Sequence, residues 1–352
     1  MTPELGRLRG GSAGPTLIVV GGIHGNEPAG VDAFRRVLAE LDPAALTGEL
    51  VGFRGNPAAL VAGRRYLVRD LNRQWMPALI ASARAAADPA RAAADPARAA
   101  ADPARAAADP ARAAADPARA AADPARAAAD PARATVDPDP EATALMALAD
   151  ALERVLERAR GPVFALDLHT TSAEGIPFAI AGTRADDRRF AAAFPLPIIV
   201  GLQESLGGTL TEYLAARRCV ALAVEGGQHA GPASIAHHEA VIRIGLAAAG
   251  ITSPSRLDAA RDLLARARGD LPRQIEVAVR HPVGPGFRMV PGFANIQRAA
   301  TGTLLAHDAG GEIRAPFDGV VLMPLYQAQG TDGFFYGREV SNDPARTASA
   351  ER

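Results

Sequence analysis

Two histidines and a glutamate occupy positions in this sequence that suit a metal ion. His24 and Glu27 stand three residues apart just after the apolar run 15–20, and His169 directly follows a second apolar run, 161–168. Two imidazoles and one carboxylate are protein ligands of a catalytic zinc site, whose fourth position is left to water. The absence of a cysteine partner argues against a closed structural site. A lone histidine at a strand end is ordinarily a polar residue whose hydrogen bonds are satisfied. Because a histidine follows each of two strands here, the sequence predicts one Zn²⁺ per chain.

Groups for proton transfer and substrate binding stand in two other runs. The apolar run 219–224 ends at Glu225, a carboxylate that can take a proton from a metal-activated water and later protonate a leaving amine. The run 66–73 ends in Asn72 and Arg73, and the fork of an arginine can make two parallel bonds to a substrate carboxylate. These groups predict hydrolysis of a small substrate that carries a carboxylate.

Patterns along the chain indicate the elements that position these residues. Apolar runs broken by glycine and proline predict buried strands, and apolar residues at spacings of three and four predict amphipathic helices. The predicted strands are 15–20, 161–168, 197–200 and 219–224. The predicted helices are 30–41, 141–159, 208–218, 233–249 and 255–269. Strands that alternate with helices indicate an α/β fold with a mostly parallel, mixed sheet flanked by helices. Because ligands bind beyond the carboxyl ends of such strands, the candidate residues are expected at one edge.

The pattern of apolar runs, glycines and prolines changes near residue 274. A length of 352 residues has room for about two domains. A zinc-dependent catalytic α/β domain is predicted over 1–250 and a helical linker over 251–274. Short β-like runs broken by glycine and proline then predict a small all-β domain over 275–340. We expect 341–352 to be a loose tail.

A low-complexity repeat interrupts the predicted catalytic domain. From 85 to 133 the unit Ala-Ala-Ala-Asp-Pro-Ala-Arg occurs seven times. A coiled coil needs two bulky apolar positions in each heptad, whereas here the apolar side chains are alanine methyls. The proline in every unit removes an amide donor, although Asp followed by Pro can begin short, kinked helical turns. We interpret the repeat as an inserted segment without a chemical role.

Composition and charge exclude several classes of function. All 38 basic residues are arginines. The absence of lysine excludes Schiff-base chemistry, and it also excludes a phosphate-binding loop of the kind that needs a lysine. A formal net charge of −1 gives no field to hold a polyanion, so neither nucleic acid nor a membrane surface is an expected partner. We expect no bilayer span and no secretion signal, because no run is apolar for long enough. The single cysteine, Cys219, fits a reducing compartment, so a cytoplasmic location is predicted.

Four short runs resemble the succinylglutamate desuccinylase/aspartoacylase family, a branch of the zinc carboxypeptidase-like fold. In the order that the family uses, they are Gly-Ile-His-Gly-Asn-Glu at 22–27, Asp-Leu-Asn-Arg at 70–73, Asp-Leu-His at 167–169 and Val-Glu-Gly at 224–226. The resemblance covers roughly 16–84 and 135–245 for a catalytic domain, and more loosely 275–340 for a β domain.

The resemblance implies that His24, Glu27 and His169 bind zinc and that Glu225 is the general base. A carboxylate that hydrogen-bonds to a ligand histidine orients its ring, and Asp167 is a candidate for this role that sequence spacing does not establish.

The resemblance also implies that Arg65 polarises the scissile carbonyl and that Asn72 and Arg73 hold the substrate carboxylate. The neighbouring Arg64 stays an alternative to Arg65, because the choice depends on register. The aspartoacylase branch has a tyrosine from its C-terminal domain that reaches the substrate, and no tyrosine of the stretch 323–336 can be aligned to that role.

Other chemically versatile side chains have ordinary interpretations. His237 and His238 fall in a predicted helix and are expected to be solvated or to cap it. His229 is left open between a pocket residue and a loop residue. Cys219 is expected to be an inert buried thiol, and packing is the role expected of the large aromatic residues Trp75, Phe334 and Phe335.

Three functions of different classes use these residues. The first is a zinc-dependent amidohydrolase that removes the acyl group from an N-acyl amino acid or a related small carboxylate. A zinc carboxypeptidase acting on peptides shares every motif, and a non-catalytic binding or scaffold protein with a relict site is the third. The acyl group, the amino acid and the oligomeric state stay open, and a homo-oligomer is compatible with the sequence.

Overall fold

The computed structural model describes residues 2–87, 139–255 and 257–340. All but the first three residues of the repeat 85–133, and the whole tail 341–352, lie outside these ranges. The predictions made for those two segments therefore stay predictions.

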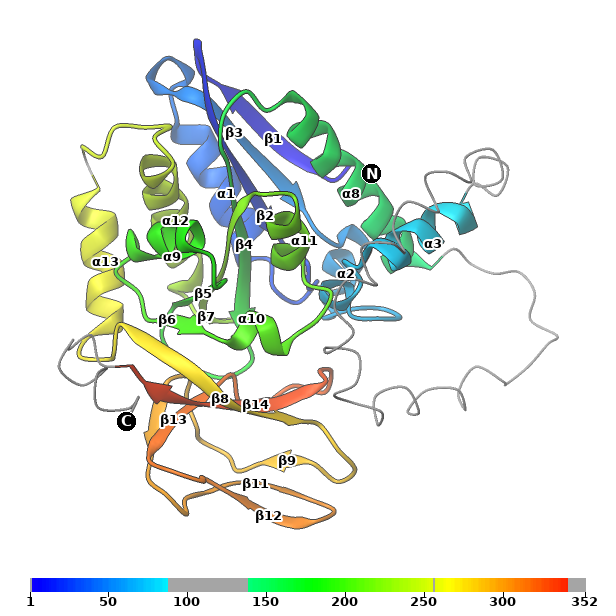
Figure 1. The fold of residues 1–352 in the computed structure, drawn as a ribbon, viewed down its shortest axis with the longest axis vertical. Helices are drawn as coiled ribbons and strands as arrows, with labels where there is room; N and C mark the ends of the chain where they lie inside the picture. The colour runs from blue at the N-terminus through cyan, green and yellow to red at the C-terminus, as the bar shows by residue number, and fades with distance from the viewer. Residues whose placement is uncertain (1, 88–138, 256, 341–352) are drawn as a thin grey trace.

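Among the described residues, eleven strands form one mixed sheet (Figure 1). Its parallel centre is, in spatial order, β3 (Thr47–Arg54), β2 (Ser12–Gly21), β4 (Val163–Thr171) and β7 (Val220–Gln228). β1 (Glu4–Arg9) pairs antiparallel with β3 at one edge. Beyond β7 follow β5 (Phe178–Ala181), which is antiparallel to β7, and then β6 (Ile198–Val200) and β8 (Gln274–Pro282), each parallel to its predecessor. The predicted α/β class with a mixed sheet is confirmed.

The C-terminal part is antiparallel β structure, as predicted. β14 (Asp332–Glu339) pairs with β8, and β13 (Gly319–Leu322) and β10 (Gln297–Ala299) extend the same sheet further. A second sheet holds β12 (Gly311–Arg314), β11 (Leu304–Asp308) and β9 (Arg288–Met289). The C-terminal strands thus continue the edge of the large sheet, and the exact domain boundaries stay predictions.

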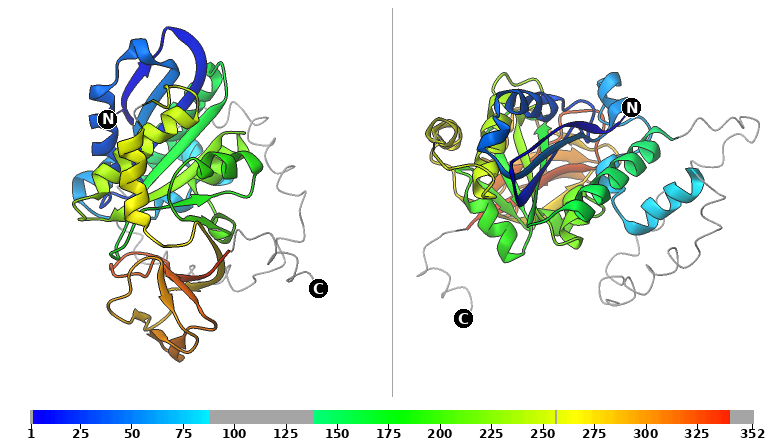
Figure 2. Two further views of the ribbon diagram at one scale, coloured as in Figure 1. Left: turned by 90° about the vertical axis from the view of Figure 1, so that its left-hand side faces the viewer. Right: turned by 90° about the horizontal axis from the view of Figure 1, so that it is seen from above.

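Helices flank both faces of the large sheet (Figure 2). One face is covered by α1 (Ala29–Glu40), α9 (Ala185–Ala192), α12 (Ser234–Ala248) and α13 (Asp258–Arg268). The other is covered by α3 (Pro77–Ala87), α8 (Pro140–Arg158) and α11 (Leu210–Ala216). Short helices lie in the connections: α2 (Pro57–Ala62), α10 (Leu202–Ser205) and two 3-10 turns, Pro43–Ala45 and Leu71–Arg73.

The position of β2 between two helical layers explains why its sequence is almost wholly apolar. Leu17 and Val19 pack into the core beneath α1 and α12, whereas Ile18 and Val20 pack into the core beneath α8 and α11. A parallel strand that is buried on both faces has a continuous run of apolar residues, because the side chains on neither face contact water. This strand leads directly to His24 and Glu27.

Three strands of the large sheet were not predicted, and each lacks a long apolar run. β1 is an edge strand whose residues are mostly half-buried, β3 contains two glycines and a glutamate, and β5 has four residues. Their pairing with neighbours stabilises them more than their own composition does.

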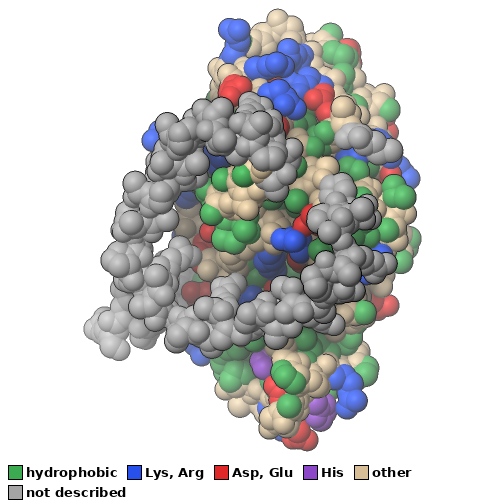
Figure 3. All heavy atoms as spheres, turned by 90° about the vertical axis from the view of Figure 1, so that its right-hand side faces the viewer, with side chains coloured by type: hydrophobic (Ala, Val, Ile, Leu, Met, Phe, Trp, Pro, Cys, Tyr) green, Lys and Arg blue, Asp and Glu red, His purple; other side chains and the backbone are tan. Residues whose placement is uncertain are grey.

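The surface carries charge of both signs. On the face drawn in Figure 3, arginines and acidic side chains lie interspersed, and arginines gather at its upper end. None of the helices in the described ranges has both the length and the apolar composition needed to cross a membrane.

Candidate metal centre

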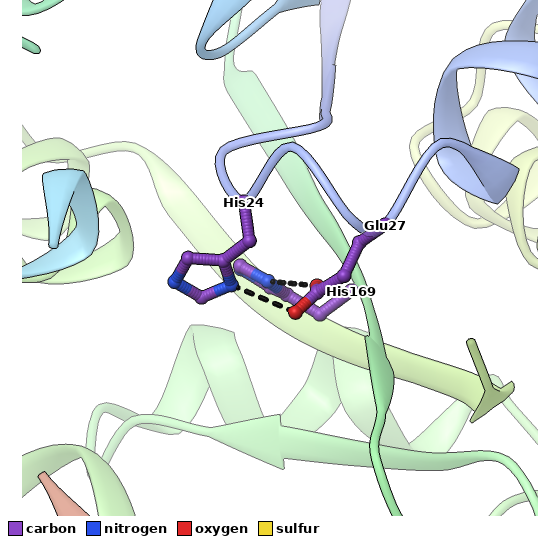
Figure 4. Close-up of side chains that lie close together, drawn as sticks. All are labelled: His24, Glu27 and His169. Carbon is purple, nitrogen blue, oxygen red and sulfur yellow. Dashed lines mark hydrogen bonds and ion pairs between the residues drawn. The ribbon is translucent and has the colours of Figure 1, made fainter. Parts of the chain in front are cut away.

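His24, Glu27 and His169 meet near the carboxyl ends of β2 and β4 (Figure 4). The Glu27 carboxylate reaches both rings: Oε1 lies 2.9 Å from His24 Nδ1, and Oε2 lies 3.0 Å from His169 Nδ1. The three side chains are buried, and one ligand atom of each lies within 4.8 Å of those of the other two. The structure therefore brings together the three residues that the sequence singled out, as a group that could hold a metal ion.

A carboxylate stands behind each imidazole. His24 Nε2 lies 3.2 Å from Asp70 Oδ1, and His169 Nε2 lies 3.0 Å from Asp167 Oδ2. A proton on His24 Nε2 is donated to Asp70, which leaves the Nδ1 lone pair of that ring directed at the space beside Glu27, whereas Asp167 lies within ion-pair distance of the His169 ring. Metal-binding histidines are usually oriented in this way, so the donor set fits a zinc ion.

The charges in the cluster reinforce one another. Burial raises the pKa of Glu27, but the imidazoles of His24 and His169 outweigh it and hold that pKa well below its usual value. Burial lowers the pKa of His169, but the carboxylates of Asp167 and Glu27 outweigh it and raise that pKa well above its usual value. The carboxylates thus favour positive charge among these rings.

A tight turn brings His24 and Glu27 to the same point. The Glu27 amide donates to the His24 carbonyl at 3.1 Å, and the Gly25 amide donates to the Arg65 carbonyl at 3.2 Å. A Cβ on Gly25 would lie 2.0 Å from the carbonyl carbon of Ala59, so only glycine fits between α2 and the ligand turn.

Glu225 lies beside this group. It stands opposite His169 in the parallel pairing of β4 and β7, so the two side chains share one face of the sheet. Burial raises the pKa of the Glu225 carboxyl to about 8, although the charges of His169 and Arg65 act to lower it. Glu225 thus lies beside the cluster, and its role as a general base stays a prediction.

Arg65 also points into the cluster. Its Nη2 donates to Asp70 Oδ2 at 3.0 Å, and its Nη1 lies 3.5 Å from Glu27 Oε1. Arg64 is exposed, so of the two adjacent arginines Arg65 is the one beside the cluster.

Asn72 and Arg73 have partners that the sequence did not reveal. Asn72 Nδ2 lies 3.3 Å from His169 Nε2, and its Oδ1 accepts from the Leu210 amide at 2.9 Å, at the start of α11. Arg73 Nη2 donates to Asp332 Oδ2 at 2.9 Å, and Asp332 comes from the C-terminal part of the chain.

The expectation that His237 and His238 are solvated or cap a helix is wrong. Both are buried, because α12 turns this side toward the sheet, and His237 Nδ1 donates to the Gly226 carbonyl at 2.7 Å. Burial lowers the pKa of His238 to about 3, so this ring is neutral. A Cβ on Gly226 would lie 2.5 Å from the His238 ring, which explains the glycine that follows Glu225.

The connection between β13 and β14, residues 323–331, supplies further groups near the cluster. Gln327 Oε1 accepts from Asn26 Nδ2 at 2.9 Å and lies 3.2 Å from His229 Nε2. His229 Nδ1 lies 2.8 Å from the Thr170 hydroxyl, so His229, in the turn after β7, contacts residues that adjoin His169 and Glu27. No local pattern marked Gln327 in the sequence.

The two C-terminal tyrosines do not reach the cluster. The Tyr326 hydroxyl donates to the Val290 carbonyl at 2.7 Å, and the buried Tyr336 hydroxyl donates to the Ala299 carbonyl at 2.7 Å. Both hydroxyls are therefore used inside the C-terminal β part. The aromatic residues Trp75, Phe334 and Phe335 are buried packing groups, as is Cys219.

Comparisons with known proteins agree with this geometry. The model of the succinylglutamate desuccinylase/aspartoacylase catalytic domain matches residues 13–116. A succinylglutamate desuccinylase of Yersinia enterocolitica is 34% identical over 67 residues, which are 18% of this chain and 20% of that relative. One of Serratia proteamaculans is 35% identical over 77 residues, 21% of this chain and 22% of that relative. The predicted resemblance to the succinylglutamate desuccinylase/aspartoacylase family is confirmed over these residues.

Solved structures show a similar fold over nearly the whole chain. A succinylglutamate desuccinylase/aspartoacylase of Rhodobacter sphaeroides superposes with a TM-score of 0.62 at 18% identity, covering 96% of this chain and 88% of the other. A product-bound ectoine utilization protein of Ruegeria pomeroyi gives 0.59 at 20% identity, with coverages of 94% and 87%. The curated relatives, by contrast, align over only about a fifth of their length.

Proposed function

We propose that the protein is a zinc-dependent amidohydrolase that cleaves the amide of an N-acyl amino acid or a related small carboxylate. The observation that carries this proposal is the buried His24–Glu27–His169 group, with a carboxylate behind each imidazole and Glu225 beside it. Similarity to a family named for deacylases supports hydrolysis of an acyl group.

In this proposal His24, Glu27 and His169 hold one zinc ion per chain. Bound zinc would supply the positive charge that makes water nucleophilic near neutral pH. Glu225 accepts a proton from the attacking water and returns it to the leaving nitrogen, so that the C–N bond breaks to give an acid and an amine. Burial raises the pKa of this carboxyl, and a raised pKa suits a group that must accept a proton and donate it again in one cycle.

Two arginines position the substrate in this proposal. Arg65, close to Glu27 and Asp70, polarises the carbonyl oxygen of the amide. Arg73, together with Asn72, holds the free carboxylate of the substrate, and this contact selects acylated amino acids over neutral amides.

The metal assignment is tested by elemental analysis of a single variant and its control. His24→Ala should lose the zinc that the wild-type chain binds, because two ligands hold the ion far less well than three. His307→Ala, which removes a half-buried histidine of β11 in the C-terminal part, should keep it. Near-stoichiometric zinc in His24→Ala would overturn the ligand set, and no zinc in the wild type would favour a non-catalytic binding protein.

The substrate class is tested at Arg73. Arg73→Ala should fold and keep its zinc but lose kcat/KM mainly on substrates with a free carboxylate, since the fork that binds it is gone. The measurement compares an N-acyl amino acid with its amide on wild type and variant. Equal loss on both substrates would remove the carboxylate-binding role.

A zinc carboxypeptidase remains the alternative because it uses the same groups. Product analysis separates the two: N-acyl amino acids should be cleaved much faster than C-terminally free peptides. The cytoplasmic location and a possible homo-oligomer stay predictions, which cell fractionation and light scattering would test.

A further inference from the structure

The guanidinium of Arg73 faces a carboxylate of its own chain. Asp332, the first residue of β14, accepts from Arg73 Nη2 through Oδ2 at 2.9 Å and from Arg280 Nε through Oδ1 at 2.6 Å. Arg280 belongs to β8, and its Nη1 also donates to the Ser205 carbonyl at 2.6 Å. The Asp332 side chain is 11% exposed, so this is a largely buried contact between the 3-10 turn that bears Arg73 and the C-terminal part.

The charges of this group are unbalanced. Arg73 and Arg280 bring two positive charges and Asp332 brings one negative charge, and the nearby carboxylate of Asp70 is itself paired with Arg65 and His24. The group therefore attracts a second carboxylate, but that carboxylate meets the negative charge of Asp332 at the same guanidinium. Because the Arg73 side chain is only 21% exposed, the repulsion is poorly screened by solvent.

Asp332 stands at the end of a segment that is fixed close to the metal centre. In the connection 323–331, Gln327 contacts Asn26 next to a ligand, and Gln329 Nε2 donates to the Tyr66 carbonyl at 3.2 Å. The second bond of Asp332, to Arg280, holds its carboxylate when Arg73 is engaged elsewhere. Asp332 can thus yield Arg73 without becoming an unpaired buried charge.

We propose that Asp332 sets the affinity of the site by competing with the substrate carboxylate for Arg73. An incoming carboxylate replaces Asp332 at Arg73 while Asp332 stays paired with Arg280. After hydrolysis, Asp332 returns to Arg73 and helps to release the amino acid product, which carries the same carboxylate. This inference rests on the carboxylate-binding role proposed for Arg73.

The test measures binding of succinate and of its neutral diamide, succinamide, by calorimetry on the metal-free chain at low ionic strength. Asp332→Asn keeps the shape of the side chain and removes the competing charge, so it should bind succinate roughly 10-fold more tightly than wild type. Succinamide binding should not change. Asp270→Asn, which removes an exposed carboxylate elsewhere in the chain, should match wild type for both ligands.

A second variant and an Arg73 arm make every outcome decisive. If Asp332→Asn folds poorly, Asp332→Ser replaces it, because it also removes the carboxylate but has a smaller side chain. It should give the same gain in succinate affinity. Unchanged or weaker succinate binding in a folded Asp332 variant would overturn the competition and leave Asp332 as a structural ion pair. If Arg73→Ala binds succinate as well as wild type does, the role proposed for Arg73 is wrong, which is a separate failure.

Discussion

Glu141 offers a sharp test of how the segment that bears Arg65 is held. It lies in the first turn of α8 and is fully buried, yet no cation pairs with it among the described residues. Its Oε1 accepts from the Leu67 amide at 2.8 Å and from Asn56 Nδ2 at 3.1 Å, and its Oε2 accepts from the Val68 amide at 3.0 Å. The carboxylate thus clamps the chain just after Arg65.

The perturbation is Glu141→Gln, which keeps the shape but replaces one oxygen by a donor. If the amide oxygen takes the place of Oε1, the hydrogen bonds from the Leu67 amide and Asn56 survive, but their acceptor is no longer charged. The Val68 amide then faces an NH₂ group. An unsatisfied buried donor costs about 1–3 kcal/mol. Weakening of the two surviving bonds adds a cost on the order of 1 kcal/mol. Glu141→Gln should therefore lower the free energy of unfolding by about 2–4 kcal/mol.

Urea unfolding, followed by circular dichroism, measures this loss. Glu157→Gln provides the control, because Glu157 lies on the same helix but is exposed, and the change should cost less than about 0.5 kcal/mol. The folded fraction of Glu141→Gln should also have a reduced kcat/KM, since its loosened segment carries Arg65. A loss for Glu141→Gln no larger than that of the control would refute the clamp.

Three further predictions concern the base and the repeat. Glu225→Gln should lower turnover by roughly 10²–10⁴-fold with zinc retained, and activity within a few-fold of wild type would identify another group as the base. Burial raises the pKa of Glu225 from 4.5 to about 8, so in the metal-free protein its contribution to stability is full below the lower value and is lost as the pH rises through the upper one. Urea unfolding at about pH 6 and about pH 8.5 should show the stability of wild type falling relative to Glu225→Gln, and a constant difference would contradict this. Deleting 85–133, so that Arg84 joins Ala134, should leave an active enzyme with an unchanged unfolding midpoint, because alanine methyls add little burial; inactivity with zinc still bound would reveal a role for the repeat.

Local patterns in the sequence determined the elements that carry the candidate metal centre. The run that becomes β2 is apolar on both faces, and the ligand turn follows it directly, so His24 and Glu27 could be placed at a strand end. The same holds for His169 in β4 and Glu225 in β7. Parallel strands place their carboxyl ends at one edge, which is why these residues could be expected together before their distances were known.

The partners of these residues depended on which strands became neighbours. Asp332 meets Arg73 only because β14 pairs with β8 at the far side of the large sheet, across 259 positions of the chain. Gln327 reaches Asn26 through the same arrangement. Periodicity records which side of an element is buried, but it carries no information about which distant element packs there. The histidines of α12 show the same limit, because their burial follows from the sheet beneath them rather than from any property of the helix itself.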